Sequence, residues 1–232
     1  MGTLVSYTLD DGVATIAMDD GKVNVLSLAM QSELNAALDR AEQDGAVVVL
    51  AGRDGVFSAG FDLPALRAGG PDALDMLQGG FVLAERLLSF PTPVVIACTG
   101  HAIAMAVFLL LSGDYRIGAA GPHKLTANEV AIGMTLPRAA IELCRQRLTP
   151  AVFNRAVILA EVFSPEDAVA GGLLDRVAPA DELLDVARST AGALAKLDLR
   201  AHASTKLRAR EQTLHALRAA IEADDADLRP RA

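Results

Sequence analysis

Residues 56–63 read VFSAGFDL, and this stretch says more about the fold than any other part of the chain. Its apolar start suits a buried strand, and Ser58, Ala59 and Gly60 then allow a sharp turn of the backbone. A second stretch, 102–106, has small alanines at alternate positions and also follows an apolar run. Small residues at two such junctions indicate either close backbone packing or exposed N–H groups that can bind negative charge on a ligand oxygen.

The residues before this stretch alternate between strands and a helix. Two short runs, 5–9 and 13–18, flank an Asp-Gly pair and predict a hairpin. Ser27 can cap a helix whose apolar residues recur every three to four positions and which ends before Gly45. Residues 46–50 are all apolar, as is typical of a parallel strand covered on both faces. The order indicates a βαβ unit and an α/β protein.

Strands and helices continue to alternate after a polar loop around residues 69–71. No repeat or change of composition marks a second domain. The pattern predicts helices over 72–88 and 104–111, strands over 94–97 and 115–117, a helix beginning at Ser164-Pro165, and helices from 181 onward.

Composition excludes several classes of protein. The chain has 232 residues, 52% of them hydrophobic, and a formal charge of -8, which argues against a nucleic-acid partner. The apolar stretch 94–113 is interrupted by Thr99-Gly100-His101, so we interpret it as buried core and expect no membrane partner. Two isolated cysteines and the absence of a secretory signal indicate a cytoplasmic protein.

No metal or cofactor motif occurs in the sequence. There is no His-Glu-x-x-His, no phosphate-binding loop and no Gly-x-Gly-x-x-Gly after a strand. A Gly-x-Ser-x-Gly nucleophile elbow is also absent. We therefore expect neither a metal nor a separate cofactor.

Five stretches, in order over about residues 5–190, resemble motifs of the crotonase (enoyl-CoA hydratase/isomerase) superfamily. SAGFDL at 58–63 is similar to the family's Ser-Ala-Gly-x-Asp-Leu motif. The remaining four stretches are 13–26, 100–114, NEVAIG at 128–133, and 164–177. The resemblance implies a ClpP/crotonase-like spiral of ββα units over 1–190, C-terminal helices over 191–232 in the same domain, and assembly as a homotrimer or hexamer.

The resemblance also implies a ligand and a site. The family binds an acyl-CoA thioester, with coenzyme A as part of the substrate, and holds the enolate oxygen with two backbone N–H groups. These donors map to Ala59 and Met105. The positions that correspond to substrate and coenzyme A contacts are Val25, Gly60, Phe61, Asp62, Leu63 and Phe108.

Catalytic acids distinguish the reactions within the family. Its hydratases use two glutamates, and here Phe108 occupies the first position. The second aligns with Glu129 if one residue is inserted in the loop 118–126, and with Asn128 if it is not. With Glu129 in place, a single carboxylate could move a proton from C2 to C4 of a 3-enoyl thioester, as the family's isomerases do.

Three functions stay open at this point. An enoyl-CoA isomerase or hydratase of fatty acid metabolism is favoured, with slight preference for the isomerase. A catalytically inactive acyl-CoA-binding protein is the alternative, because Phe108 replaces an acid and the C-terminal segment is shorter than is common in the family. Hydrolysis or C–C cleavage of a ketone that is not a thioester is the third.

Overall fold

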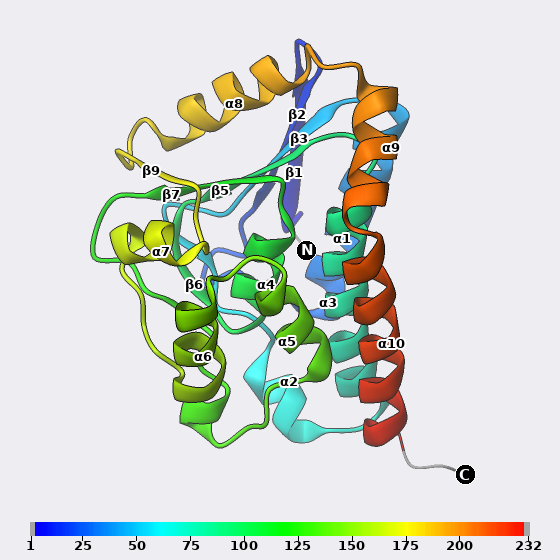
Figure 1. Ribbon diagram of the computed structural model, residues 1–232, viewed down its shortest axis with the longest axis vertical. Coiled ribbons are helices and arrows are strands. Elements are labelled where there is room, and N and C mark those ends of the chain that lie inside the picture. The colour runs from blue at the N-terminus through cyan, green and yellow to red at the C-terminus, as the bar shows by residue number, and fades with distance from the viewer. Residues whose placement is uncertain (1–2, 230–232) are drawn as a thin grey trace.

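The computed structural model describes residues 3–229, which form two sheets surrounded by helices (Figure 1). The larger sheet has the strand order β1-β2-β3-β5-β7-β9, with β1 antiparallel to β2 and the other pairs parallel. Its strands are β1 (Val5–Asp10), β2 (Val13–Met18), β3 (Val47–Ala51), β5 (Val94–Cys98), β7 (Tyr115–Ala119) and β9 (Arg176–Ala178).

A second, three-stranded parallel sheet gives the fold its spiral form. It consists of β4 (Gly55–Ser58), β6 (Gly100–Ile103) and β8 (Leu125–Thr126). Each turn of the chain adds one strand to the large sheet and the next to the small one, as β3 and β4, β5 and β6, and β7 and β8 do. The predicted α/β spiral of ββα units is thereby confirmed.

Strand β6 lies between the strand predicted over 94–97 and the helix predicted over 104–111, where the sequence predicted no element. The backbones of β4 and β6 approach so closely there that a Cβ atom on Gly100 would lie 1.9 Å from the carbonyl carbon of Gly55. Only glycine allows this approach without moving a strand. The short strand therefore depends on a contact between segments distant in sequence.

The large sheet is covered on both faces, which explains its uniformly apolar strands. Alternate residues of β3, such as Val47 and Val49, face α8 (Leu183–Leu194). The intervening Val48 and Leu50 belong to the main core, with α1 (Leu28–Gln43), α3 (Pro71–Ser89) and α4 (Met105–Ser112). Figure 1 shows α8 across one face of the sheet and these three helices beneath the other.

The hairpin, the α1 cap at Ser27 and the later helix start at Ser164 are as predicted. The remaining helical segments complete the described structure. These helices are α2 (Leu63–Ala68), the 3-10 turn η1 (Val130–Ile132), α5 (Arg138–Arg145), α6 (Pro150–Leu159), α7 (Pro165–Gly171), α9 (Leu199–Ala209) and α10 (Glu211–Leu228). Helix α2 was not predicted, because its six residues are too few to show a helical period.

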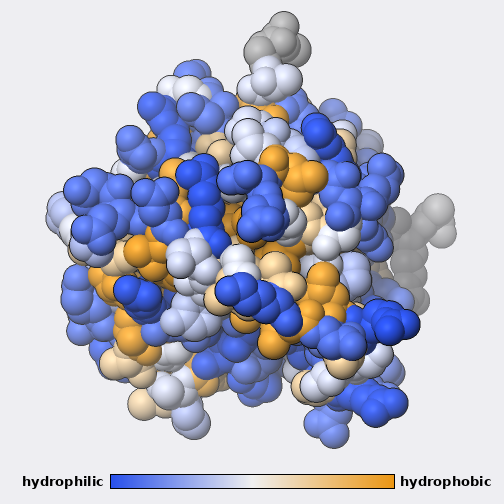
Figure 2. Space-filling view, turned by 90° about the horizontal axis from the view of Figure 1, so that it is seen from above, coloured by the Kyte–Doolittle hydropathy of each residue, from blue (hydrophilic) through white to orange (hydrophobic). Residues whose placement is uncertain are grey.

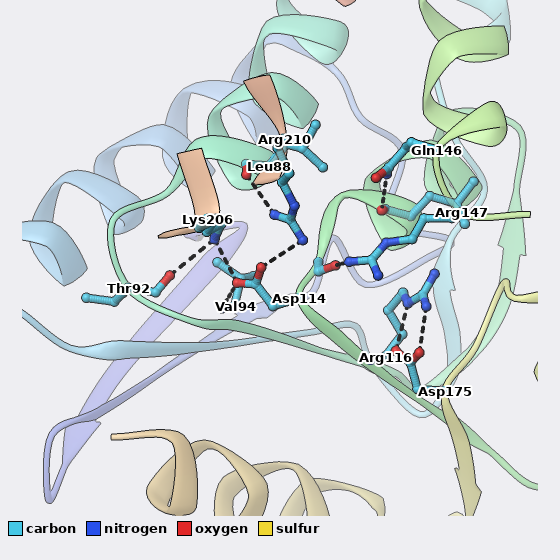
Figure 3. A network of polar contacts seen from close by, with 12 residues as sticks. Leu88, Thr92, Val94, Asp114, Arg116, Gln146, Arg147, Asp175, Lys206 and Arg210 are labelled. Carbon is cyan, nitrogen blue, oxygen red and sulfur yellow. Dashed lines mark hydrogen bonds and ion pairs between the residues drawn. The ribbon is translucent and has the colours of Figure 1, made fainter. Parts of the chain in front are cut away.

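Helix α9 is fixed to the sheet by a buried group of charges that we call the Asp114 cluster (Asp114, Lys206 and Arg210; Figure 3). The Asp114 carboxylate accepts hydrogen bonds from Lys206 at 2.7 Å and from the Val94 N–H at 2.8 Å, and it forms an ion pair with Arg210 at 2.9 Å. Arg210 also donates to the Leu88 carbonyl at 2.7 Å. The C-terminal helices are thus connected to α3 and to the start of the strands β5 and β7.

The face of the molecule seen in Figure 2 is mostly polar. Figure 2 shows hydrophilic side chains over most of one face, with small hydrophobic patches between them. Across residues 3–229, no helix has the length and apolar character needed to cross a membrane.

Candidate active site

A small, largely apolar cavity lies where α2, α3 and α4 meet the segment before α5, and we call it the inner cavity. Its volume is about 80 Å³. Most of its lining is aliphatic or aromatic, and the polar side chains among the described lining residues are two neighbours, Asn128 and Glu129. The lining residues are Ala59, Phe61, Leu63, Leu66, Leu77, Phe81, Ile103, Ala104, Phe108, Asn128, Glu129, Ile132, Met134 and Pro137.

Glu129 brings a carboxyl group to this cavity. It directly precedes η1, its exposed fraction is only 8%, and within the described residues Oε2 has no hydrogen-bond partner. Burial raises the pKa of Glu129 to about 7, because an apolar surrounding disfavours the charged form. A carboxyl group with this pKa can both accept and donate a proton near neutral pH.

Asn128 lies beside Glu129 in the same wall. Its Oδ1 atom is also buried without a hydrogen-bond partner in the described part of the chain. The sequence left open which of the two faces the site, and the structure places both side chains on the cavity. Of the two, only Glu129 can exchange a proton.

Phe108 keeps the opposite part of the cavity apolar. It lies in the first turn of α4, and its exposed fraction is 1%. Its ring is stacked on Phe81 with 6.1 Å between the centroids. Among the lining residues that the structure describes, Glu129 is therefore the one ionisable group.

The backbone at the start of α4 is shaped to present N–H groups. Ala104 has a φ of 53°, an unusual value for a residue with a side chain, and this conformation turns the chain from β6 into α4. Gly60 lies against this turn: a Cβ atom there would be 3.1 Å from Met105 N and 2.7 Å from the Ile103 oxygen. Met105 is the first residue of α4, where N–H groups lack a partner within the helix.

The prediction that Ala59 supplies an N–H group to the ligand is wrong. Ala59 lines the cavity, but its N–H donates to the Val23 carbonyl at 2.9 Å and is already used. In the described chain, neither Phe61 N nor Met105 N donates to an acceptor. Phe61 directly follows Gly60 and also lines the cavity. Phe61 and Met105 thus each have an N–H group near the cavity without an acceptor in the described chain.

Some of the predicted substrate-binding residues line the inner cavity, and the others do not. Phe61, Leu63 and Phe108 line the inner cavity, and Leu63 is partly open to solvent. Gly60 supports the backbone at Met105, as described above.

Two of the predicted substrate-binding residues, Asp62 and Val25, form hydrogen bonds outside the inner cavity. Asp62 caps α2, since its Oδ1 accepts from the Ala65 N–H at 3.1 Å. Val25 does not line the cavity, and its N–H donates to Asp20.

Sequence reasoning missed the apolar residues that come from distant elements. Phe81 on α3 contacts the site through its ring, and Pro137 comes from the segment between η1 and α5. The only sequence signal for Phe81 is its place on the apolar face of an amphipathic helix, which does not distinguish a cavity from the core.

Comparison with known proteins gives concordant matches over nearly the whole chain. A family model described as enoyl-CoA hydratase/isomerase matches residues 8–229. The apo structure of the Mtb enoyl-CoA isomerase is 50% identical, covers 98% of this chain and 100% of its own, and has a TM-score of 0.94.

Other relatives carry a different activity in their names. The structure of enoyl-CoA hydratase EchA3 from Mycobacterium ulcerans is 50% identical, with coverage of 97% and 100% and a TM-score of 0.93. A Mycobacterium avium protein named probable enoyl-CoA hydratase echA17 is 30% identical over 185 residues, which are 78% of this chain and 72% of that protein.

Proposed function

The chain belongs to the enoyl-CoA hydratase/isomerase family, and we propose that it isomerises a 3-enoyl-CoA to a 2-enoyl-CoA through an enolate of the acyl group. The observation that carries this proposal is that Glu129, whose Oε2 has no hydrogen-bond partner among the described residues, is the one ionisable group in the described lining of a largely apolar cavity. Because relatives of equal identity are named as hydratase and as isomerase, the choice between the reactions rests on the site itself.

The first step is removal of a proton. The Glu129 carboxylate accepts a proton from C2, and the electron pair of the broken C–H bond forms the C1–C2 double bond of an enolate. Negative charge then develops on the thioester oxygen. The N–H groups of Phe61 and Met105 stabilise this oxygen, and Met105 adds the favourable field at a helix N-terminus.

The second step returns the same proton to a different carbon. The Glu129 carboxylic acid donates to C4, and the electrons of the C3–C4 double bond and the enolate shift to leave a double bond between C2 and C3. Atoms and charge balance without water, metal or a further cofactor. A carboxyl group with a pKa of about 7 suits both directions of this transfer.

Hydration needs more than this cavity offers. Addition of water requires one group to orient and deprotonate the water and another to protonate C2. Phe108 stands where a second acid would be needed, and the remaining lining near it is aromatic or aliphatic. These contacts support isomerisation over hydration.

The proposal is tested by an absorbance assay with two substrates, a 3-enoyl-CoA and crotonyl-CoA. We expect the 3-enoyl-CoA to be converted to the conjugated 2-enoyl-CoA, and crotonyl-CoA to be left unhydrated. Rapid hydration of crotonyl-CoA would contradict the choice of reaction. Tight binding of both thioesters without turnover would favour the inactive acyl-CoA-binding protein.

Self-association is a second part of the proposal. Apolar side chains are exposed on η1 and on the neighbouring α6, among them Ile132 and Leu159, which are 45% and 69% exposed. Covering them in a homotrimer would bury apolar surface next to the loop that carries Glu129. Light scattering of the purified protein tests this, with a trimer or hexamer expected and a monomer contradicting it.

A further inference from the structure

Two buried oxygen acceptors at the inner cavity lack a donor. They are Asn128 Oδ1 and Glu129 Oε2, and neither has a hydrogen-bond partner among the described residues. Buried acceptors without a partner are destabilising and rare in folded proteins, so each one calls for an explanation. Glu129 is explained by its proposed task of carrying a proton. Asn128 is not, because a carboxamide does not exchange a proton.

The backbone that carries both side chains is held by the turn that follows it. The Ile132 N–H donates to the carbonyl oxygens of Asn128 at 3.2 Å and of Glu129 at 3.1 Å. The Met134 N–H donates to the same Glu129 carbonyl at 2.9 Å, and Gly133 closes the turn with a φ of 79°. The two side chains therefore start from one fixed turn and line one cavity.

The donor for Asn128 Oδ1 is identified by the chemistry of the cavity. Apart from Asn128 itself, the described lining side chains are aliphatic or aromatic except for Glu129, which presents an O–H when it is protonated. The acyl part of an enoyl thioester has neither an O–H nor an N–H group. A cavity of about 80 Å³ leaves little room for water beside such a ligand. With the acyl group bound, the donor at hand is thus the protonated carboxyl group of Glu129.

A thiol on α5 also senses the charge on Glu129 but does not compete for the proton. Burial, and to a smaller extent the Glu129 carboxylate, raises the pKa of Cys144 to about 12, so the thiol stays neutral. Burial is also the main cause of the raised pKa of Glu129. Since the thiol keeps its own proton, the proton taken from the substrate stays on Glu129.

We propose that Asn128 is a positioning residue whose Oδ1 accepts a hydrogen bond from the protonated Glu129 carboxyl group between the two proton transfers. This inference rests on the proposed function, in which Glu129 takes a proton from C2 and returns it to C4. The hydrogen bond limits rotation of the carboxyl group and slows loss of the proton to solvent. Asn128 itself gains and loses no proton, so the balance of the isomerisation is unchanged.

The sign of one pKa change tests this contact in the ligand-free protein. A hydrogen bond to the neutral form raises the pKa of an acid, so Asn128→Leu should lower the pKa of Glu129 from about 7 by about one pH unit. If the amide donated to the carboxylate or only filled space, the apolar leucine would raise this pKa or leave it unchanged. A ¹³C NMR titration of the Glu129 carboxyl signal, assigned by its loss in Glu129→Gln, measures the pKa.

Two further variants support this titration. Asn128→Met also removes the acceptor while keeping the site filled with an apolar side chain, and it serves if Asn128→Leu does not fold. Asn154→Leu is the matched control, because Asn154 is exposed on α6, outside the inner cavity. It should keep the wild-type pKa of Glu129.

The fate of the transferred hydrogen tests the positioning role during turnover. When a 3-enoyl-CoA is converted in D₂O, the wild type should return mainly the substrate's own hydrogen to C4. Asn128→Leu should place more deuterium at C4 of the product than the wild type and Asn154→Leu do. Mass spectrometry of the product at low conversion measures this difference.

The outcomes separate this inference from the proposed function. An unchanged or higher pKa of Glu129 in the apolar variants, or wild-type retention of the substrate hydrogen in them, would overturn the role of Asn128 and leave the proposed function standing. If the wild type does not isomerise a 3-enoyl-CoA, or Glu129→Gln does so equally well, the proposed function fails and the role of Asn128 fails with it.

Discussion

Glu129 and the Asp114 cluster are two buried charged regions with opposite arrangements. Asp114 accepts hydrogen bonds from Lys206 and the Val94 N–H and forms an ion pair with Arg210, and Figure 3 shows these groups converging on one carboxylate. Glu129 is more deeply buried than Asp114, yet its Oε2 has no partner among the described residues. A buried charge that is fully paired fixes structure, whereas one left unpaired is available for chemistry.

Desolvation acts on both regions, but its consequences differ. Burial raises the pKa of Glu129 to about 7, and no neighbouring cation opposes this. Burial also lowers the pKa of Lys206 to about 8, although Asp114 opposes the shift. The comparison predicts that substitutions at Glu129 change activity and that substitutions in the cluster change stability.

The largest effect is expected from Glu129→Gln. Removing the proton carrier while keeping the shape should lower kcat for a 3-enoyl-CoA by about 10²- to 10⁴-fold. The free energy of unfolding at pH 8 should be unchanged or higher, because an unpaired buried charge is lost. Steady-state kinetics and urea unfolding measure the two quantities.

The matched control for this substitution is Glu222→Gln, an exposed position on α10. It should change neither quantity. A clear loss of stability in Glu129→Gln without a loss of kcat would reverse the roles assigned to the two regions.

Asp114→Asn should have the largest effect on stability. It leaves Lys206 and Arg210 buried without their carboxylate, and breaking such a group costs about 3–5 kcal/mol. The kcat of the folded protein at low temperature should stay close to the wild-type value, since Asp114 is outside the inner cavity. Urea unfolding and kinetics on the same sample test both statements. A variant as stable as the wild type would show that the cluster does not anchor α9.

The pH dependence of the free energy of unfolding reports the ionisation of Glu129. In the folded state its pKa is raised to about 7, above the usual value of 4.5, so the unfolded chain loses this proton at lower pH. Stability should therefore fall as pH rises from about 4.5 to about 7, by about 3 kcal/mol from this group.

The difference in stability between the wild type and Glu129→Gln, measured by urea unfolding across this pH range, removes the contribution of all other groups. A difference that does not vary with pH would mean that Glu129 has an ordinary pKa. In the same window, kcat/KM of the wild type should rise with pH, because the carboxylate is the form that removes the proton.

Lys206→Met should have the smallest effect. Methionine fills similar space, and Asp114 keeps Arg210 and the Val94 N–H as partners. We expect a loss of about 1–2 kcal/mol in urea unfolding, well below that of Asp114→Asn. Equal losses in the two variants would show that the ion pair with Lys206, and not the carboxylate as a shared acceptor, stabilises the cluster.

Local signals were sufficient for the elements with regular periods. The helix capped by Ser27 and the apolar strands are found where the sequence predicted them. The small sheet was only partly predicted, because β8 has two residues and β6 depends on contact of Gly100 with Gly55. The break between α9 and α10 at Arg210 has no Gly or Pro, and Arg210 is instead held by Asp114 and Leu88.

The site was predicted less completely than the fold. Family resemblance brought out Glu129, Met105 and Phe108, which the structure places at or near one cavity. It assigned the wrong N–H group at Ala59, because the competing acceptor, Val23, lies on a loop 36 positions earlier in the chain. The neighbouring Phe61 could not be preferred from sequence, since hydrogen bonds between distant loops leave no local pattern.

The most direct test of the central claim follows a 3-enoyl-CoA by NMR with the wild type and with Glu129→Gln. The account predicts conversion to 2-enoyl-CoA by the wild type without accumulation of a 3-hydroxyacyl-CoA, and a rate at least about 10²-fold lower in the variant. Accumulation of the hydrated product, or equal rates for the two proteins, would contradict the assignment of Glu129 as the single group that moves the proton.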